Sequence, residues 1–215
     1  MIGFQDAQAQ VLDHVTVLED EQTPILNALG RVLVHEIAAP RDIPHETNSA
    51  MDGIAVRHED VNGASSGNGR GLTLVGESRA GRPFEGSIGP GQAVRIMTGA
   101  VVPTGADTVV MAEDACPGEG EVVVLRDPGK GANIRLRGEH VSRGDTVLRQ
   151  GETIGPSEIG ILASLGLTNV QVFRKPVVAI LPTGDELVNL GDILGPGRVF
   201  SSNTYSLAAH VLECG

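Results

Sequence analysis

Three tracts of the chain each place a polar side chain beside a glycine at the edge of an apolar, strand-like run. Glycine has no Cβ, so it lets the backbone turn sharply or approach a ligand closely. Three such tracts in one chain indicate an anion, or a substrate bound through a metal, held at the ends of strands. The tracts are 49–56 with Asp52 and Gly53, 95–100 with Thr98, Gly99 and Ala100, and 177–187 with Gly184, Asp185 and Glu186.

The first two tracts also allow ordinary structural roles. Asp52 stands where a strand begins, and aspartate is depleted in strands, so we expect its carboxylate to face solvent, a turn amide or a ligand. It could equally cap a turn. The hydroxyl of Thr98 and the amides around Gly99 could hold an oxyanion, or they could form a simple turn at the end of a strand.

The adjacent acids Asp185 and Glu186 follow a run that predicts a strand buried on both faces. In open α/β sheets, ligands bind beyond the carboxyl ends of the strands. Two neighbouring carboxylates suit Mg²⁺, which takes one or two carboxylates together with water and substrate oxygens. A solvated acidic loop is the alternative, and the sequence leaves both open.

Other patterns argue against common kinds of site. The glycine-rich basic stretch 129–137 lacks the GxxxxGK[ST] pattern of a phosphate loop, although Arg135 and Arg137 could contact an anion. The six histidines show no zinc-ligand spacing. There is no GxSxG elbow to support serine hydrolase chemistry.

Bulk composition narrows the class of protein. The net charge of −11 opposes binding to nucleic acid or anionic lipid. Aromatic residues make up only 2% of the chain, which argues against stacking on single-stranded nucleic acid. The 40% of hydrophobic residues supports a packed core, built mainly from aliphatic side chains.

The sequence carries no sign of export or membrane insertion. No apolar run reaches the roughly 18 residues of a membrane span, and acids stand where a signal peptide would be basic and then apolar. Cys116 and Cys214 lie far apart and read as free thiols of a reducing compartment. We therefore expect a cytoplasmic protein that binds neither membrane nor nucleic acid.

Apolar spacing predicts a mixed α and β, multidomain fold. Helical periodicity covers 4–18; a second, short helix is expected from Thr23 to Gly30, and a strand over 31–39. From 43 to 138 the pattern is all-β, with no helical period. The strands expected there are 49–56, 72–77, 91–97, 107–112 and 121–126.

The C-terminal third changes character. We expect a strand at 146–148, a helix at 156–165 and a strand at 170–173. The aliphatic run 177–181 predicts a buried strand, and a helix should begin near Ser201. Strand, loop and helix open a doubly wound α/β domain. Because one such unit cannot bury its own apolar faces, we expect the N-terminal part of a longer protein.

Taken in order, these motifs resemble the molybdopterin molybdenumtransferase family, which includes the E domain of gephyrin. The resemblance runs over nearly the whole chain, and several of the tracts are long enough to be specific. The tracts are 49–53, 95–103, 105–110, 133–135, 138–139, 183–187 and 202–203.

The resemblance implies a transferase of molybdenum cofactor biosynthesis. Such enzymes take adenylylated molybdopterin and molybdate, insert the metal, and release AMP in a Mg²⁺-dependent step. By matching motifs, the implied catalytic residues are Asp52, Thr98 and Glu186, and the implied Mg²⁺ ligands are Asp52, Asp185 and Glu186. Substrate binding would involve Gly53, Gly99, Ala100, Arg135, Gly184, Asp185, Ser202 and Asn203.

The resemblance also implies a homodimer. The β-rich domain of one subunit would face the α/β domain of the other, so that Asp52 and Thr98 would meet Glu186 of the partner subunit. The expected domains are an N-terminal helix that packs on the α/β domain (1–24), an α+β domain (25–42 plus 139–175), a β-rich domain (43–138) and the truncated start of the α/β molybdopterin-binding domain (176–215).

Three positions depart from the family pattern. His140 stands where an aspartate usually follows Gly-Glu, Ile54 replaces an aromatic residue, and Ser201 replaces an aspartate. An imidazole at 140 puts a metal role there in doubt and would alter the pH dependence. Because the rest of the α/β domain and a C-terminal β domain would lie beyond Gly215, we expect this chain alone not to complete catalysis. A non-catalytic scaffold or dimerisation module of the same fold is the alternative.

Overall fold

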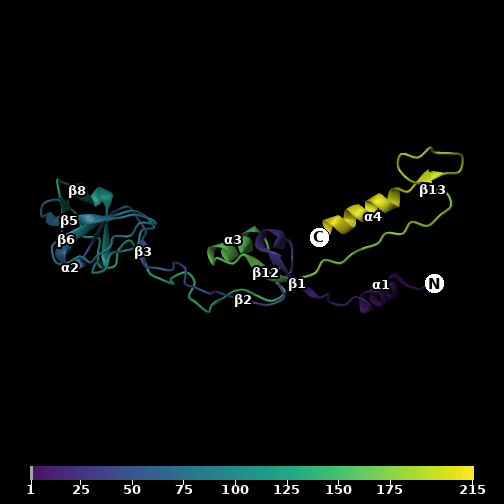
Figure 1. The fold of residues 1–215 in the computed structure, drawn as a ribbon, viewed down its shortest axis with the longest axis horizontal. Coiled ribbons are helices and arrows are strands. Elements are labelled where there is room, and N and C mark those ends of the chain that lie inside the picture. The colour runs from purple at the N-terminus through teal and green to yellow at the C-terminus, as the bar shows by residue number, and fades with distance from the viewer. Residues whose placement is uncertain (1) are drawn as a thin grey trace. The chain divides into compact units, whose positions relative to one another are not determined.

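The computed structural model describes residues 2–215, which form two compact units (Figure 1). One unit is the continuous segment Ala38–Asp145. The other joins the two flanking segments, Met1–Ile37 and Thr146–Gly215. The first unit is therefore an insertion in the second.

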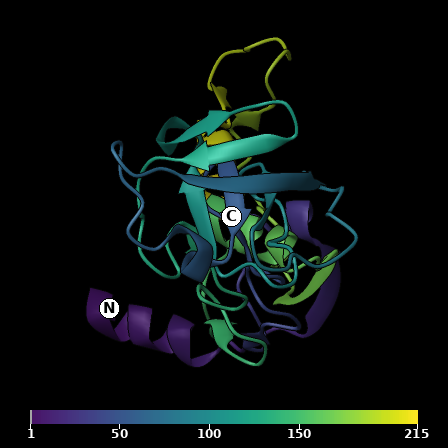
Figure 2. The same cartoon turned by 90° about the vertical axis from the view of Figure 1, so that its left-hand side faces the viewer.

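A six-stranded sheet, curled into a half-barrel, dominates the inserted unit (Figure 2). Its strands lie in the order β7-β4-β6-β5-β9-β8. Neighbours are antiparallel except β5 and β6, which run parallel. The elements of the unit are β3 (Asn48–Ser49), β4 (Gly53–Val56), α2 (His58–Val61), β5 (Arg70–Ser78), β6 (Gln92–Ile96), β7 (Thr108–Met111), η2 (Ala112–Asp114), β8 (Ala115–Pro117), β9 (Glu121–Val124) and β10 (Ile134–Arg135).

Alternating apolar residues cover both faces of this sheet. Successive side chains of a strand point to opposite faces, and in β4 Ile54 belongs to one buried cluster while Ala55 belongs to another. All four residues of β4 are consequently buried. The strand that follows Asp52 is thus held from both sides.

The two ends of the inserted unit meet. The amide of Ala39 donates to the carbonyl of Asp145 at 2.8 Å, and the amide of Gly144 donates back to the carbonyl of Ala39 at 2.9 Å. Farther in, Ile43 pairs antiparallel with Val141. The chain enters and leaves this unit along paired segments.

The flanking unit has its own aliphatic core around α3. Strand β1 pairs antiparallel with β12, from Asp20 opposite Phe173 to Pro24 opposite Asn169. The core is formed by Ala28, Leu33, Leu148, Ile154, Leu162, Val170 and Val172. The elements are α1 (Phe4–Asp13), β1 (Asp20–Pro24), η1 (Ile25–Ala28), β2 (Ile37–Ala38), β11 (Thr146–Leu148), α3 (Pro156–Ser164), β12 (Asn169–Phe173), β13 (Leu187–Val188), β14 (Val199–Phe200) and α4 (Ser202–Glu213). Strand β2, at the junction of the two units, pairs with β11.

Most elements agree with the sequence predictions, and the mixed α and β class is confirmed. The strand at 146–148 and the helices α3 and α4 lie where they were expected. The expectation that 43–138 holds no helix is wrong, because α2 spans His58–Val61. A single helical turn is too short to show an apolar period.

The N-terminal predictions need correction. Thr23 and Pro24 end strand β1, where Thr23 pairs with Val170, and only 25–28 coil as a 3₁₀ helix. Pairing with β12 outweighs the local helix-start signal, since propensity is a weak prior against tertiary contacts. Helix α1 ends at Asp13, short of the expected 18. Of the expected strand 31–39, only β2 forms, with isolated bridges before it.

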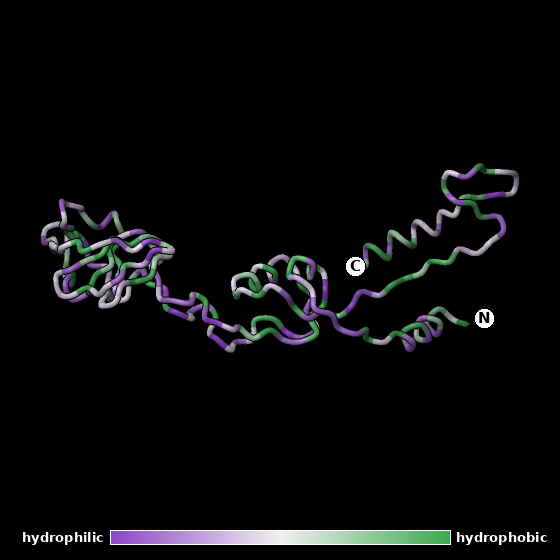
Figure 3. The backbone as a smooth tube through the Cα atoms, viewed as in Figure 1, coloured by the Kyte–Doolittle hydropathy of each residue, from purple (hydrophilic) through white to green (hydrophobic). Residues whose placement is uncertain are grey.

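The buried strand expected at 177–181 is also wrong. The run is hydrophobic (Figure 3) but unpaired, and Val177 and Leu181 are 94% and 83% exposed. A strand needs neighbours to bury its faces and satisfy its backbone, and no strand among the described residues 2–215 pairs with this one. The doubly wound α/β domain stays a prediction.

Two smaller expectations concern cysteines and membranes. Cys116 and Cys214 are free, as expected, and both are exposed. None of the helices described in residues 2–215 is long and apolar enough to span a bilayer.

Gly53→Ala should destabilise the inserted unit, because a Cβ at residue 53 would lie 1.9 Å from the carbonyl oxygen of Val110. Overpacking of this kind costs about 1–3 kcal/mol. Gly71→Ala is the matched control, since a Cβ there meets no atom within 4 Å. Amide hydrogen exchange in β4 and β7 is the measurement, because the chain has no tryptophan and its one tyrosine lies in α4. Equal protection in the two variants would contradict the packing argument.

Candidate functional site

Asp52 and Thr98 lie together because β4 pairs with β6. The antiparallel register places Gly53 opposite Ile96, so the residue before β4 meets the residues after β6. Thr98 donates two hydrogen bonds to Oδ1 of Asp52, one from its backbone amide and one from its hydroxyl, each 2.7 Å long. Two polar groups from separate tracts of the sequence thus form one pair.

The turn that carries Thr98 is tied to strand β3. Gly99 has φ +78°, in the left-handed region that favours glycine. Its amide donates to the carbonyl of Ser49 at 2.8 Å, and the amide of Ser49 donates to the carbonyl of Ala100 at 2.9 Å. Gly99 is therefore needed for the shape of this turn.

All three amides of this turn are used inside the protein. Thr98 donates to Asp52, Gly99 to Ser49, and Ala100 to the carbonyl of Met97 at 2.9 Å. These amides are not free to bind an oxyanion, contrary to one expectation for this tract. The alternative, a strand-ending turn, is what the structure shows, and its effect is to orient Asp52.

Two residues to which sequence reasoning gave no role position the segment before Asp52. The buried hydroxyl of Ser49 donates to the carbonyl of Met51 at 2.5 Å. Asn133, with φ 57°, donates from Nδ2 to the carbonyl of Val109 at 2.8 Å and accepts the amide of Ala50 at 2.9 Å. Asparagine tolerates this left-handed conformation better than most residues, and its tract 133–135 is one of those that resemble the family.

Hydrogen bonding keeps the Asp52 carboxylate ionised. The backbone amide of Thr98 lowers the pKa of Asp52 below its ordinary value, the Thr98 hydroxyl lowers it further, and the opposing effect of desolvation is smaller. Hydrogen bonds to the charged form of an acid favour that form. Asp52 thus carries a negative charge at neutral pH.

Only one oxygen of Asp52 is engaged. Both bonds from Thr98 end on Oδ1, and no donor within residues 2–215 reaches Oδ2. The side chain is exposed. A fixed, ionised carboxylate with a free oxygen can bind a cation or accept a hydrogen bond from a substrate. The cap of a turn and a ligand site are therefore compatible roles for this residue.

A cavity of about 260 Å³ opens beside this pair, entirely within the inserted unit. Its walls are mainly apolar, with Ile54, Ala115 and Val122 among them. Asp52 and Arg95 are the charged residues that line it.

The predicted acids of the third tract belong to the flanking unit. Asp185 and Glu186 are both exposed, directly before β13. The carbonyl of Asp185 accepts a hydrogen bond from the guanidinium of Arg198, and that of Glu186 accepts one from the amide of Val199 at 2.9 Å. The Glu186 carboxylate folds back over Gly184. No group of three or more metal-ligating side chains forms among residues 2–215.

The remaining predicted residues are spread over both units. Ser202 and Asn203 open α4, and the hydroxyl of Ser201 lies 2.6 Å from that of Thr204. Arg135 is exposed in β10, opposite Asn48. His140 is exposed, with Nε2 3.7 Å from the Glu139 carboxylate. The inserted unit thus brings together the 49–56 and 95–100 tracts, with the 133–135 tract paired beside them, while the acids of the third tract lie in the flanking unit.

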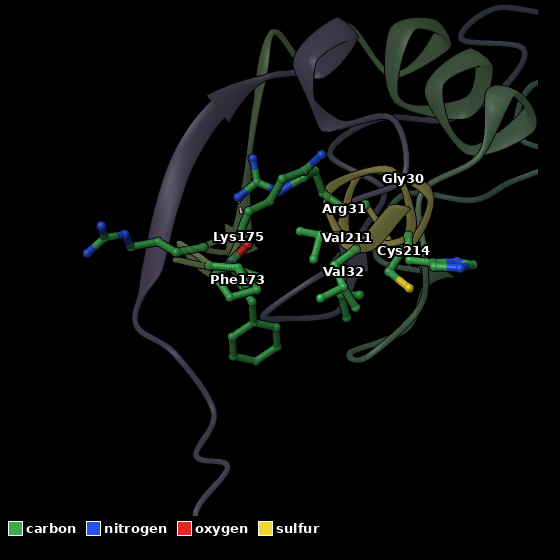
Figure 4. Close-up of a pocket in the computed structure, with 13 residues that line it drawn as sticks. Gly30, Arg31, Val32, Phe173, Lys175, Val211 and Cys214 are labelled. Atoms are coloured by element: carbon green, nitrogen blue, oxygen red, sulfur yellow. Dashed lines mark hydrogen bonds between the residues drawn. The ribbon is translucent and has the colours of Figure 1, made fainter. Parts of the chain in front are cut away.

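The flanking unit holds a larger cavity, of about 410 Å³ (Figure 4). Arg31, one of its lining residues, is committed to the carboxylate of Glu21 and the carbonyl of Phe173. Most of the lining is apolar, with Val32 and Val211 among the residues in view. None of the predicted site residues lines it, so it carries no support for the candidate site.

Comparison with known proteins decides the family. A family model described as the MoeA N-terminal region, domains I and II, matches residues 2–166. The chain belongs to the MoeA N-terminal region family.

Relatives of this MoeA N-terminal region are molybdopterin molybdenumtransferases. The chain is 40% identical to the enzyme of that name from Nostoc sp., which it covers to 50%, and 38% identical to molybdopterin molybdenumtransferase 2 of Mycobacterium tuberculosis, which it covers to 53%. Both alignments include the whole chain. The chain therefore spans about half the length of the curated relatives it matches.

Solved structures agree with this assignment. The crystal structure of a molybdopterin biosynthesis MoeA protein from Pyrococcus horikoshii superposes with a TM-score of 0.89 at 32% identity, over 99% of this chain and 57% of the other. A second crystal structure of the MoeA protein from that organism gives 0.86, over 100% and 55%. The resemblance read from the sequence motifs is confirmed.

Thr98→Val should raise the pKa of Asp52 towards its ordinary value, because the hydroxyl donor is lost. The shift should be incomplete, since the stronger backbone bond from residue 98 persists. A depressed pKa contributes stability that is present above the unfolded-state value, about 3.9, and is lost as pH falls through the folded one. In Thr98→Val this contribution is smaller, and its loss is complete at a higher pH. Carboxyl ¹³C NMR titration of Asp52 measures it. Thr98→Ser, which keeps the hydroxyl, is the control, and an identical pKa in both variants would contradict the role of the hydroxyl.

Proposed function

We propose that this chain is the N-terminal part of a molybdopterin molybdenumtransferase, which inserts molybdenum from molybdate into adenylylated molybdopterin and releases AMP. Its MoeA family membership and the names of its relatives support this. The observation that carries the proposal is the ionised, exposed carboxylate of Asp52, fixed by Thr98 where two buried strands meet.

Asp52 is the proposed cation ligand. Its free Oδ2 and its lowered pKa fit Mg²⁺, a hard cation that binds through one or two carboxylates. Mg²⁺ bound there would neutralise charge on the phosphoanhydride oxygens of the substrate. The contribution of Asp52 is to hold an oxygen at a fixed position.

Thr98 acts by positioning Asp52. Both of its donors are spent on Oδ1, so it has no further proton to offer a substrate. What it supplies is orientation and a lowered pKa. Preorganised groups of this kind avoid the cost of rearrangement during reaction.

The proposal assigns further ligands to a second copy of the chain. Asp185 and Glu186 are exposed, and neither carboxylate pairs with a basic side chain within residues 2–215. In a homodimer, Asp185 and Glu186 of the partner subunit would complete the site that Asp52 begins. Arg135, Ser202 and Asn203 remain proposed contacts for the substrate.

Asp52→Asn should lower the rate of AMP release by about 10²–10³-fold, since a preorganised charge at the reacting group is lost. The assay uses adenylylated molybdopterin, molybdate and Mg²⁺. The enzyme is a chimaera in which the C-terminal half of the Nostoc relative follows residue 215, because this chain covers only half of that protein. The 215-residue chain alone, which we expect to be inactive, is measured beside it.

The control is Glu85→Gln, which removes an exposed carboxylate from the same unit, away from the cavity beside Asp52. Thr98→Ser should retain most of the activity. A chimaera that binds the substrate but releases no AMP, before any substitution, would instead favour a non-catalytic scaffold of the same fold.

Mixing two inactive chimaeras tests the shared site. If Asp52 and Glu186 act across a dimer, mixing Asp52→Asn with Glu186→Gln at equal amounts and letting subunits exchange should restore about one quarter of full activity, because half the dimers are mixed and each holds one intact site. Sites built within one subunit would give no recovery. Mixing the Asp52→Asn chimaera with itself sets the baseline.

A further inference from the structure

The cavity beside Asp52 borders the buried core of the half-barrel, since Ile54 and Val122 belong to both. Arg95 pairs in register with Ile54, two residues along β6 from the core residue Ala93. Because side chains alternate along a strand, Arg95 and Ala93 share one face. Arg95 therefore stands where the core ends and the cavity of about 260 Å³ begins.

The guanidinium of Arg95 is not held by a direct contact. Its guanidinium forms no hydrogen bond or ion pair within residues 2–215. Its register partner on β5 is Glu77, but that carboxylate lies 2.6 Å from the guanidinium of Arg79. The pKa of Glu77 is lowered first by its bond to Arg79, and Arg95 acts on it only through space. Arg95 is thus free to meet an anion.

The size of the cavity limits what it can hold. Pockets for complete small-molecule ligands usually measure about 300–1,000 Å³, so this space suits one ring system of a larger ligand. Its apolar residues, such as Ala115, Pro117 and Val122, suit the faces of a flat ring. A guanidinium matches phosphate oxygens with paired donors.

We propose that this cavity binds a planar heteroaromatic ring that is linked to a phosphate, with the ring against the apolar walls and the phosphate on Arg95. The inference rests on the proposed function, whose substrate carries two groups of this kind, the adenylate and the phosphorylated pterin. Arg95 supplies the positive charge that a phosphate requires beside the carboxylate of Asp52. It is a substrate-binding residue beyond those that the sequence motifs predict.

The test is a binding titration of the ¹⁵N-labelled 215-residue chain, followed by amide shifts. AMP and 6-hydroxymethylpterin monophosphate are the two probes, each with EDTA present so that no metal on Asp52 contributes. Saturable shifts should be confined to 52–54, 95–97 and 112–122. Arg95→Gln should weaken binding by about tenfold or more, the loss expected for one charged hydrogen bond.

Two further variants sharpen the test. Arg82→Gln removes the same charge from an exposed turn of the inserted unit that does not line the cavity, and should change affinity by less than about twofold. Ala115→Leu adds apolar bulk to the cavity and leaves the charge of Arg95 in place, and should weaken binding of the ring more than binding of inorganic phosphate.

The two probes distinguish which group of the substrate the cavity binds. Binding of AMP alone assigns the adenylate, and binding of the pterin alone assigns the pterin. No saturable shift with either probe, or equal losses in Arg95→Gln and Arg82→Gln, would overturn the proposal. Because the readout is binding, a chimaera that fails to release AMP while these shifts persist would sink the proposed function and leave the cavity assignment standing.

Discussion

The antiparallel pairing of β4 with β6 is the constraint on which the candidate site depends. It sets Gly53 opposite Ile96, and so delivers Asp52 and Thr98 to the same end of the sheet. A register shift of one residue would turn each side chain to the opposite face. Both faces of β4 are buried, which makes such a shift costly. The position of one exposed carboxylate is therefore determined by aliphatic packing several residues away.

Backbone groups determine the geometry around the Asp52–Thr98 pair. The carbonyl of Val110 occupies the space where residue 53 would carry a Cβ, and Gly99 turns the chain in a conformation that other residues avoid. Ser49 and Asn133 then hold the intervening segment by bonds to carbonyl groups. These supports end on main-chain atoms, so substitutions at Gly53, Ser49 or Asn133 should alter the geometry of the site before they alter its chemistry.

Local patterns predicted much of the fold but little of the site. Alternation gave the strands of 43–138, and proline followed by an apolar stripe gave α3. The pairing of Asp52 with Thr98 could not be read from either tract, because it depends on a strand register between distant segments. The sequence also did not predict that the amides around Gly99 are hydrogen-bonded within the protein, because their acceptors lie on other segments or depend on the turn itself. At 177–181 the pattern misled, since hydrophobicity records a need for partners and not their presence.

The inserted unit begins and ends at one place, where Ala39 exchanges hydrogen bonds with Gly144 and Asp145. Because the two ends of this unit touch, the flanking unit sees only a short gap to close, whatever the length of the inserted segment. The entropic cost of closing such a loop grows only slowly with its length. Residues 38–145 therefore form a unit that could be exchanged as one piece. A lineage could lengthen, exchange or discard this half-barrel while the path of the surrounding chain stayed intact, and a protein engineer could do the same.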